Sequence, residues 1–86
     1  MDDLKEKRQE EVDRNYKFFK GKEKELIPSK FGKFALLRHA EIVEFFDSFF
    51  DALKYGDMAF KDDMYSVQEV GAKPIKLGIL GTQIHA

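Results

Sequence analysis

The sequence predicts a single α+β domain ordered helix, strand, strand, helix, strand, with a three-stranded, mainly antiparallel sheet. Three observations predict it. The chain has 86 residues, the size of one small domain. Most of its apolar side chains fall between residues 32 and 70. Within that core, residues 33–38 and 41–46 have the composition of strands, and a capped helical segment separates them from a third strand at 64–70.

The composition indicates a folded core and excludes several classes of function. Apolar residues make up 43% of the chain and include nine Phe, although 36% of residues are charged. The absence of Cys excludes a disulfide framework and thiolate chemistry. A net charge of −1 provides no overall field to attract nucleic acid or anionic lipid. The sequence has neither an apolar leader nor an apolar run as long as a membrane span, so we expect a cytoplasmic protein.

The N-terminal segment, residues 1–20, predicts an amphipathic helix from about residue 3, because it lacks Pro and Gly and is rich in helix formers. Its apolar positions, at helical spacing on one side, are Leu4, Val12, Tyr16 and Phe19. The first two turns offer a single apolar contact, so residues 1–9 are expected to project from the domain or fray. Gly21 is a stop or kink point. A further turn is allowed before Pro28, which disfavours helix in the residue preceding it.

The two following strands predict a hairpin. His39 and Ala40 between them provide a two-residue turn but lack the Asn-Gly chemistry that such turns prefer, so a longer loop is equally compatible. Both strands are largely apolar on both faces. We therefore expect the sheet to be covered on both sides, by helices or by another subunit.

The second helix is predicted to begin at an N-cap. Ser48 is a good capping residue and Asp51 stands three residues on, in a loose capping-box pattern. Gly56 either allows close approach to the sheet or ends the helix; the apolar period favours continuation to about Phe60. In the strand at 64–70, apolar and polar residues alternate, which predicts one buried and one polar face.

No catalytic, cofactor-binding or metal-binding residue is predicted, and we expect the chain not to be an enzyme. His39 and His85 lack ligand spacing and read as structural histidines. The acidic residues Asp57, Asp62 and Asp63 fit a solvated helix end. Across the sheet, Glu44 and Glu69 are expected to pair with Arg38 or Lys33.

The apolar surface exceeds what a chain of this size buries alone, which favours a non-catalytic protein-interaction module. The module would act as a small homo-oligomer or as an accessory or inhibitory subunit of a larger partner. The aliphatic, glycine-containing tail at 71–86 is expected to lie against the domain or another chain. The expected contact surface comprises Phe18, Phe49, Phe50, Ile75, Leu77, Ile79 and Leu80.

A nucleic-acid-binding regulator, similar to an antitoxin, is the alternative function. It would use a basic cluster that consists of Lys20, Lys22, Lys24, Lys30 and Lys33. Acidic residues interleave with the bases along the first helix, which is more typical of a solvated face than of a phosphate track.

Several segments together resemble a group of small bacterial proteins of uncharacterised function. The resemblance spans roughly residues 15–80 and rests on Gly32-Lys33-Phe34, on Asp47-Ser48 at the helix start, on Val67-Gln68-Glu69-Val70 and on Pro74-Ile75-Lys76-Leu77-Gly78. It implies the same order of elements and a bacterial source, and it transfers no catalytic residue. This chain departs from the pattern at His39-Ala40, where the group has an Asp-Gly-like turn, and at Lys76, where the group has an acid.

Overall fold

The computed structural model describes residues 2–72 of the chain. Its elements are α1 (Asp2–Lys30), β1 (Phe34–Arg38), β2 (Glu41–Phe46), α2 (Phe49–Ala59) and β3 (Ser66–Glu69). The strands form one sheet in the order β2-β1-β3, and β1 is antiparallel to both neighbours. The predicted α+β class and order of elements are confirmed.

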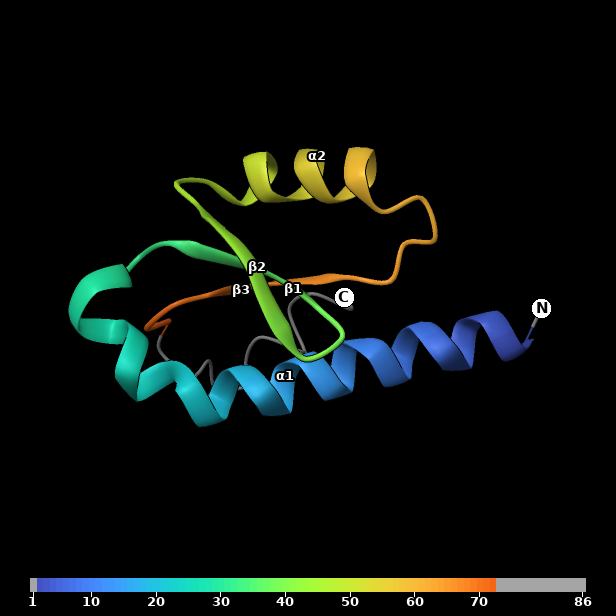
Figure 1. Cartoon of the computed structure of the whole chain (residues 1–86), viewed down its shortest axis with the longest axis horizontal. Helices are drawn as coiled ribbons and strands as arrows, with labels where there is room; N and C mark the ends of the chain where they lie inside the picture. The colour runs from blue at the N-terminus through green and yellow to red at the C-terminus, as the bar shows by residue number, and fades with distance from the viewer. Residues whose placement is uncertain (1, 73–86) are drawn as a thin grey trace, which may run out of the picture.

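The two helices cover opposite faces of the sheet, which lies between them in Figure 1. Under α1, the core consists of Phe19, Ala35, Leu37 and Val70, all 2% exposed or less. Phe18, Leu26, Ile42 and Phe45 pack around this cluster. The expectation that both faces of the sheet are covered is therefore confirmed, and helices of this same chain do the covering.

The face under α2 is aromatic. Phe34 of β1 meets Phe49 edge to face with ring centroids 6.2 Å apart, and Phe46 of β2 lies 5.4 Å from Tyr55. Such aromatic pairs add to the free energy of burial through their quadrupoles.

The first helix is longer than predicted. It continues through Gly21 and includes Pro28 in its last turn, so the expectation that it stops near residues 20–26 was wrong. Phe19 and Leu26 pack on the same core on either side of Gly21, and this tertiary packing outweighs the glycine's weak local preference. Figure 1 shows the last turns of α1 bending up toward the sheet, and the first turns extending past it. Residues 3–10 are helical and exposed.

An extra residue in β2 sets the side-chain pattern of the hairpin. Leu36 pairs with Glu44 but Leu37 pairs with Ile42, which leaves Val43 as a β-bulge. A regular strand would place Ile42 and Phe45 on opposite faces because the side-chain period is two. The bulge puts both residues on the α1 side, where they join the core.

The third strand is shorter than predicted, because regular pairing covers Ser66–Glu69 rather than 64–70. Asp63 adopts a left-handed φ of 61°, and its carbonyl accepts the Tyr65 N–H at 3.0 Å, which makes a turn before the strand. The expected polar face is not open to solvent: Ser66 is half-buried and contacts Asn15 of α1.

The second helix is built as predicted. The Ser48 hydroxyl accepts the Asp51 N–H at 3.1 Å, and Phe60 closes the helix by donating its N–H to Gly56 at 2.8 Å. Gly56 is buried against the Tyr65 ring, and a Cβ placed on it would lie 2.5 Å from Tyr65 Cε2. Close approach to the sheet is therefore the reason for a glycine here.

Candidate functional site

The turn between β1 and β2 has a strained backbone conformation, and contacts from residues outside the turn stabilise it. His39 and Ala40 have φ values of 53° and 60°, so both central residues are left-handed, as in a type I′ turn. The shorter of the two predicted connections is therefore the observed one. For residues with a Cβ, this conformation costs roughly 1–2 kcal/mol each. Other contacts have to offset that cost.

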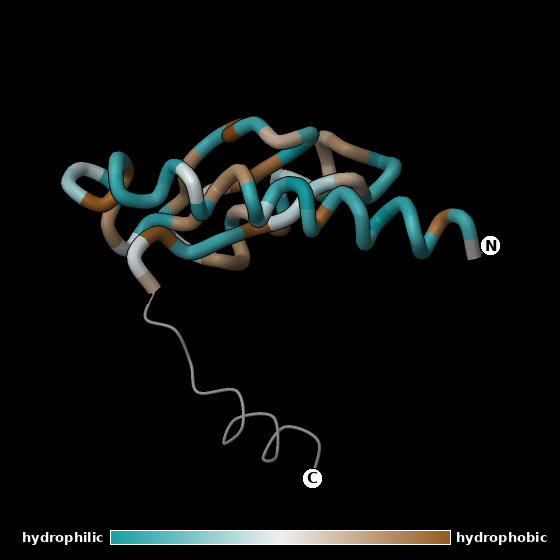
Figure 2. The backbone as a smooth tube through the Cα atoms, turned by 90° about the horizontal axis from the view of Figure 1, so that it is seen from below, coloured by the Kyte–Doolittle hydropathy of each residue, from teal (hydrophilic) through white to brown (hydrophobic). Residues whose placement is uncertain are grey.

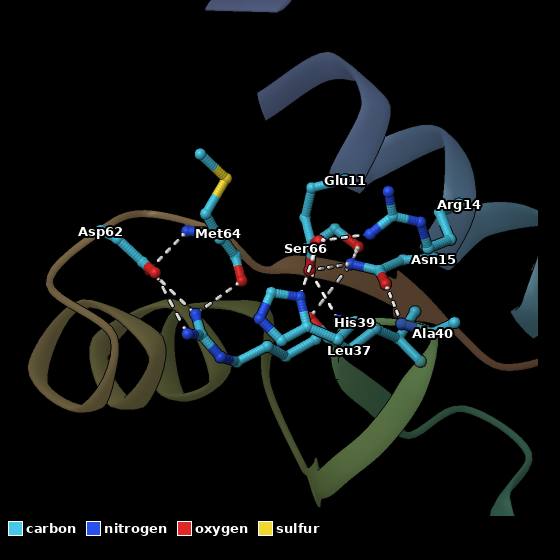
Figure 3. A network of polar contacts seen from close by, with 10 residues as sticks. Glu11, Arg14, Asn15, Leu37, His39, Ala40, Asp62, Met64 and Ser66 are labelled. Atoms are coloured by element: carbon cyan, nitrogen blue, oxygen red, sulfur yellow. Dashed lines mark hydrogen bonds and ion pairs between the residues drawn. The ribbon is translucent and has the colours of Figure 1, made fainter. Parts of the chain in front are cut away.

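Two side chains of α1, one helical turn apart, supply these contacts (Figure 3). The Glu11 carboxylate accepts the His39 backbone N–H at 2.7 Å, and the Asn15 side-chain oxygen accepts the Ala40 N–H at 2.7 Å. The Asn15 amide nitrogen donates to the Leu37 carbonyl at 3.3 Å and contacts the Ser66 hydroxyl at 3.2 Å. We call this arrangement of Glu11 and Asn15 on the turn the turn clamp.

Both side chains of the turn clamp are buried: Glu11 is 4% exposed and Asn15 is fully inaccessible. Glu11 also accepts from Asn15 at 3.1 Å, and its Oε1 lies 3.0 Å from Nδ1 of His39 and 3.4 Å from Arg14. Burial alone raises the pKa of Glu11, but hydrogen bonds from the His39 backbone, Asn15 and the His39 ring outweigh it, and the pKa falls below its ordinary value. Glu11 is therefore held as the carboxylate.

A second set of polar contacts fastens the hairpin to the loop after α2. The Arg38 guanidinium donates to both Asp62 carboxylate oxygens, at 2.8 and 3.1 Å, and to the Met64 carbonyl at 2.9 Å. It also lies 4.4 Å from the centroid of the Phe60 ring. The hydrogen bonds from Arg38 lower the pKa of Asp62 to about 2.

The predicted cross-strand ion pairs were wrong about the acidic partners. Arg38 pairs with Asp62, and Lys33 pairs with Asp47 just after β2. The sheet register pairs Glu44 with Leu36 and Glu69 with Phe34 rather than with either base.

The turn clamp was missed in the sequence. The apolar positions had suggested a helix face that includes Tyr16, but Tyr16 is 47% exposed, and the sheet-facing stripe instead follows Glu11, Asn15 and Phe19. The available signal was the place of Asn15 four residues before Phe19, where a polar residue interrupts an apolar stripe. Its partners lie 22 to 51 positions away in sequence and have no local signature.

Glu11 of the turn clamp and His39 form a histidine–carboxylate pair, in which the His39 side chain is 57% exposed. Two shallow hollows lie along α1, one lined by Lys5, Arg8, Gln9 and Val12 and the other by Glu10, Asp13, Arg14 and Lys17. Neither hollow includes His39 or Glu11. Within residues 2–72, no three His, Asp or Glu side chains gather closely enough to hold a metal ion.

The other notable feature is the exposed start of α2, which we call the α2 aromatic face: Phe49 and Phe50. Phe50 is 80% exposed and Phe49 46%, and Met58 near the end of the same helix is 67% exposed. The Phe49 and Phe50 rings stand edge to face at 6.4 Å, and Phe49 also contacts Phe34 of β1. The exposed Phe50 is thus fixed to the sheet through a chain of rings.

The remaining residues of the predicted contact surface are distributed differently. Phe18 is half-buried and packs against the core under α1, away from the α2 aromatic face. Ile75, Leu77, Ile79 and Leu80 lie outside the residues that the structure describes, as does His85.

The basic cluster has several contacts within the chain. Lys20 forms an ion pair with Glu23 at 2.7 Å, Lys33 pairs with Asp47, and Lys30 lies 5.0 Å from the Phe45 ring centroid. Lys22 and Lys24 are exposed on α1. These contacts reduce the positive charge that the cluster offers to a phosphate backbone.

No protein-family model matches this sequence, and neither the curated proteins nor the solved structures include a match to it. The resemblance to small bacterial proteins therefore stays a prediction. Over the part of the chain that the structure describes, no helix combines the length and apolar character required to cross a bilayer.

Proposed function

We propose that this chain is a non-catalytic protein-interaction module that binds its partner through the α2 aromatic face. It acts either as a small homo-oligomer or as an accessory or inhibitory subunit of a larger protein. The observation that carries the proposal is the 80% exposure of Phe50 on a helix whose position is otherwise fixed. Exposed aromatic side chains cost solubility, and aromatic residues are enriched among the energetically dominant contacts of protein interfaces.

The rigidity of this surface supports the proposal. Ser48 caps the helix immediately before Phe49, and Gly56 lets the helix sit close to Tyr65. Phe50 is therefore presented without the loss of backbone freedom that a loop would suffer on binding. Nearby charges, with Asp51 in the first helical turn and Lys54 exposed, provide the polar rim that usually surrounds an apolar contact.

Light scattering after size exclusion, at low micromolar concentration and together with hydrophobic-dye binding, tests the proposal. Phe50→Ser is the test variant, and Tyr16→Ser is the matched control, since Tyr16 is an exposed aromatic residue on the other helix. We expect either a mass above the monomer or dye binding by the monomer, and in each case loss of that property in Phe50→Ser only. A wild-type monomer that binds no dye, or equal effects of the two variants, would contradict the proposal.

A further inference from the structure

The contacts of α1 with the rest of the protein differ between its two halves. Before residue 11, the described side chains of α1 are exposed. Glu11 and Asn15, the next residues to reach the sheet, touch it through hydrogen bonds to the turn. Beyond them, Phe18, Phe19 and Leu26 bury apolar surface against Leu37 and Val70. Figure 2 shows that the residues of the N-terminal half are largely hydrophilic.

Glu11 is the ionisable member of this pair of attachments, whereas the hydrogen bonds of Asn15 with Ala40, Leu37 and Ser66 are neutral. Glu11 takes the His39 N–H and the Asn15 amide as a carboxylate acceptor. A protonated carboxyl group accepts fewer hydrogen bonds than a carboxylate does. Its own proton would also lie among groups that are themselves hydrogen-bond donors. The C-terminal half rests on burial of apolar groups, which is insensitive to pH.

The geometry points to an acid-operated latch: protonation of Glu11 releases the N-terminal half of α1 from the β1–β2 turn while the C-terminal half of α1 and the α2 layer stay packed. The release leaves the N–H groups of His39 and Ala40 without their α1 acceptors. Because the two turn residues are left-handed, the turn is unfavourable without these hydrogen bonds and relaxes to another conformation.

The charged groups around Glu11 set the direction of the effect. Arg14 faces it from α1 at 3.4 Å, His39 from the turn at 3.0 Å, and Arg38 of β1 interacts with it at longer range. Ser66 of β3 reaches the clamp only through Asn15. All three ionisable neighbours are bases, so each favours the carboxylate, and the latch stays closed at neutral pH.

The remaining acid contacts do not open in the same way. Asp62 has a pKa of about 2 and therefore keeps its charge at the pH at which Glu11 is protonated. The Arg38 contacts still join the hairpin to the loop after α2. Glu23 accepts the Gly71 N–H at 3.0 Å, and the pKa of Glu23 is lowered by its hydrogen bond with Lys20. That contact weakens in acid too, but the burial of Phe19 beside it persists.

An NMR pH titration of the full chain tests the latch. Between about pH 6 and pH 3, we expect the amide signals of His39 and Ala40 to shift together with a midpoint below 4.5, the ordinary value for Glu11. Their protection against hydrogen exchange should fall at least about tenfold, as in local opening, while that of Gly56 in α2 falls less than about twofold. Glu11→Gln should abolish the joint transition, and Glu10→Gln, which removes the neighbouring exposed carboxylate, should leave it intact.

The wild type and Glu10→Gln decide the question even if Glu11→Gln does not fold. Three outcomes would each overturn the latch. The amide signals of His39 and Ala40 could fail to move by pH 3, or Glu11→Gln could retain the transition. The third outcome is a loss of Gly56 protection at the same midpoint. Persistence of the α2 aromatic face through the transition separates this inference from the proposed function, which it neither requires nor implies.

Discussion

Asn15 and Ala40 are 25 positions apart in the sequence, and the side chain of the first accepts the backbone N–H of the second at 2.7 Å. This hydrogen bond joins the middle of α1 to a left-handed residue that local chemistry does not favour. An alanine at that φ is tolerated here because its N–H donates a hydrogen bond to a buried acceptor. The turn and the helix therefore depend on one another.

Asn15→Ala should destabilise the protein by about 3 kcal/mol, because it leaves the Ala40 N–H without its acceptor and removes the donor to the Leu37 carbonyl in a buried site. Urea unfolding followed by circular dichroism measures the loss. Arg14→Ala, one residue away and 54% exposed, is the control and should change stability by less than about 0.5 kcal/mol. Equal effects of the two substitutions would show that the turn clamp is not a principal contact.

Ala40→Gly should stabilise the protein by about 0.5–1 kcal/mol. Glycine adopts the φ of 60° without the steric cost that alanine bears, and it keeps the N–H that Asn15 accepts. Part of the gain is offset by the larger freedom of glycine in the unfolded chain. The midpoint of urea unfolding reports the change, and a lower midpoint would mean that the alanine methyl group contributes more than the strain costs.

Gly21→Ala should also stabilise the protein, by about 1 kcal/mol, through helix propensity. Gly21 is exposed within α1, and a Cβ there would meet no atom within 4 Å. The same methyl group is thus favourable at position 21 and unfavourable at position 40, because the backbone is helical at the first and left-handed at the second. Thermal unfolding of the single and double variants checks this, and the two gains should add.

Gly56→Ala should destabilise the protein by about 1–3 kcal/mol despite the better helix propensity of alanine. The added methyl group would overlap the Tyr65 ring, whose hydroxyl donates to Asp57 at 2.5 Å and holds it in place. Combination with Tyr65→Ala should remove most of the penalty in a double-mutant cycle. Simple additivity of the two changes would refute the overlap as its cause.

Stability should decline at alkaline pH through Tyr65. Burial, followed by the hydrogen bond to Asp57, raises the pKa of Tyr65 to about 12 from an ordinary value of 10.0. The unfolded chain thus loses this proton first, and the contribution of Tyr65 to stability is full below pH 10 and is lost as the pH rises toward 12. Ultraviolet absorbance should show a phenol titrating near pH 12 that Tyr65→Phe removes; an unchanged titration in that variant would contradict the assignment.

The parts of the fold that local chemistry determines were predictable, and those that depend on distant partners were not. The Ser48 cap, the role of Gly56 and the two-sided hairpin follow from composition and spacing. The length of α1 does not, because packing of Phe19 and Leu26 on one core overrides Gly21. The polar break that Asn15 makes in the apolar stripe is visible in the sequence, but the partners of the turn clamp lie far away in the chain and no periodicity reveals them. For the proposed contact surface, the sequence indicated Phe49 and Phe50 as contact residues, but not the chain of rings that joins them to Phe34.

The bulge at Val43 also affects how this protein meets others. It interrupts the regular spacing of N–H and C=O groups along β2, whose outer side is one of the two borders of the sheet. Two acidic side chains, Glu41 and Glu44, are exposed on the same strand. A foreign strand that tried to extend the sheet there would find mismatched hydrogen-bond positions and negative charge. Growth into fibres by edge addition is accordingly discouraged at this border.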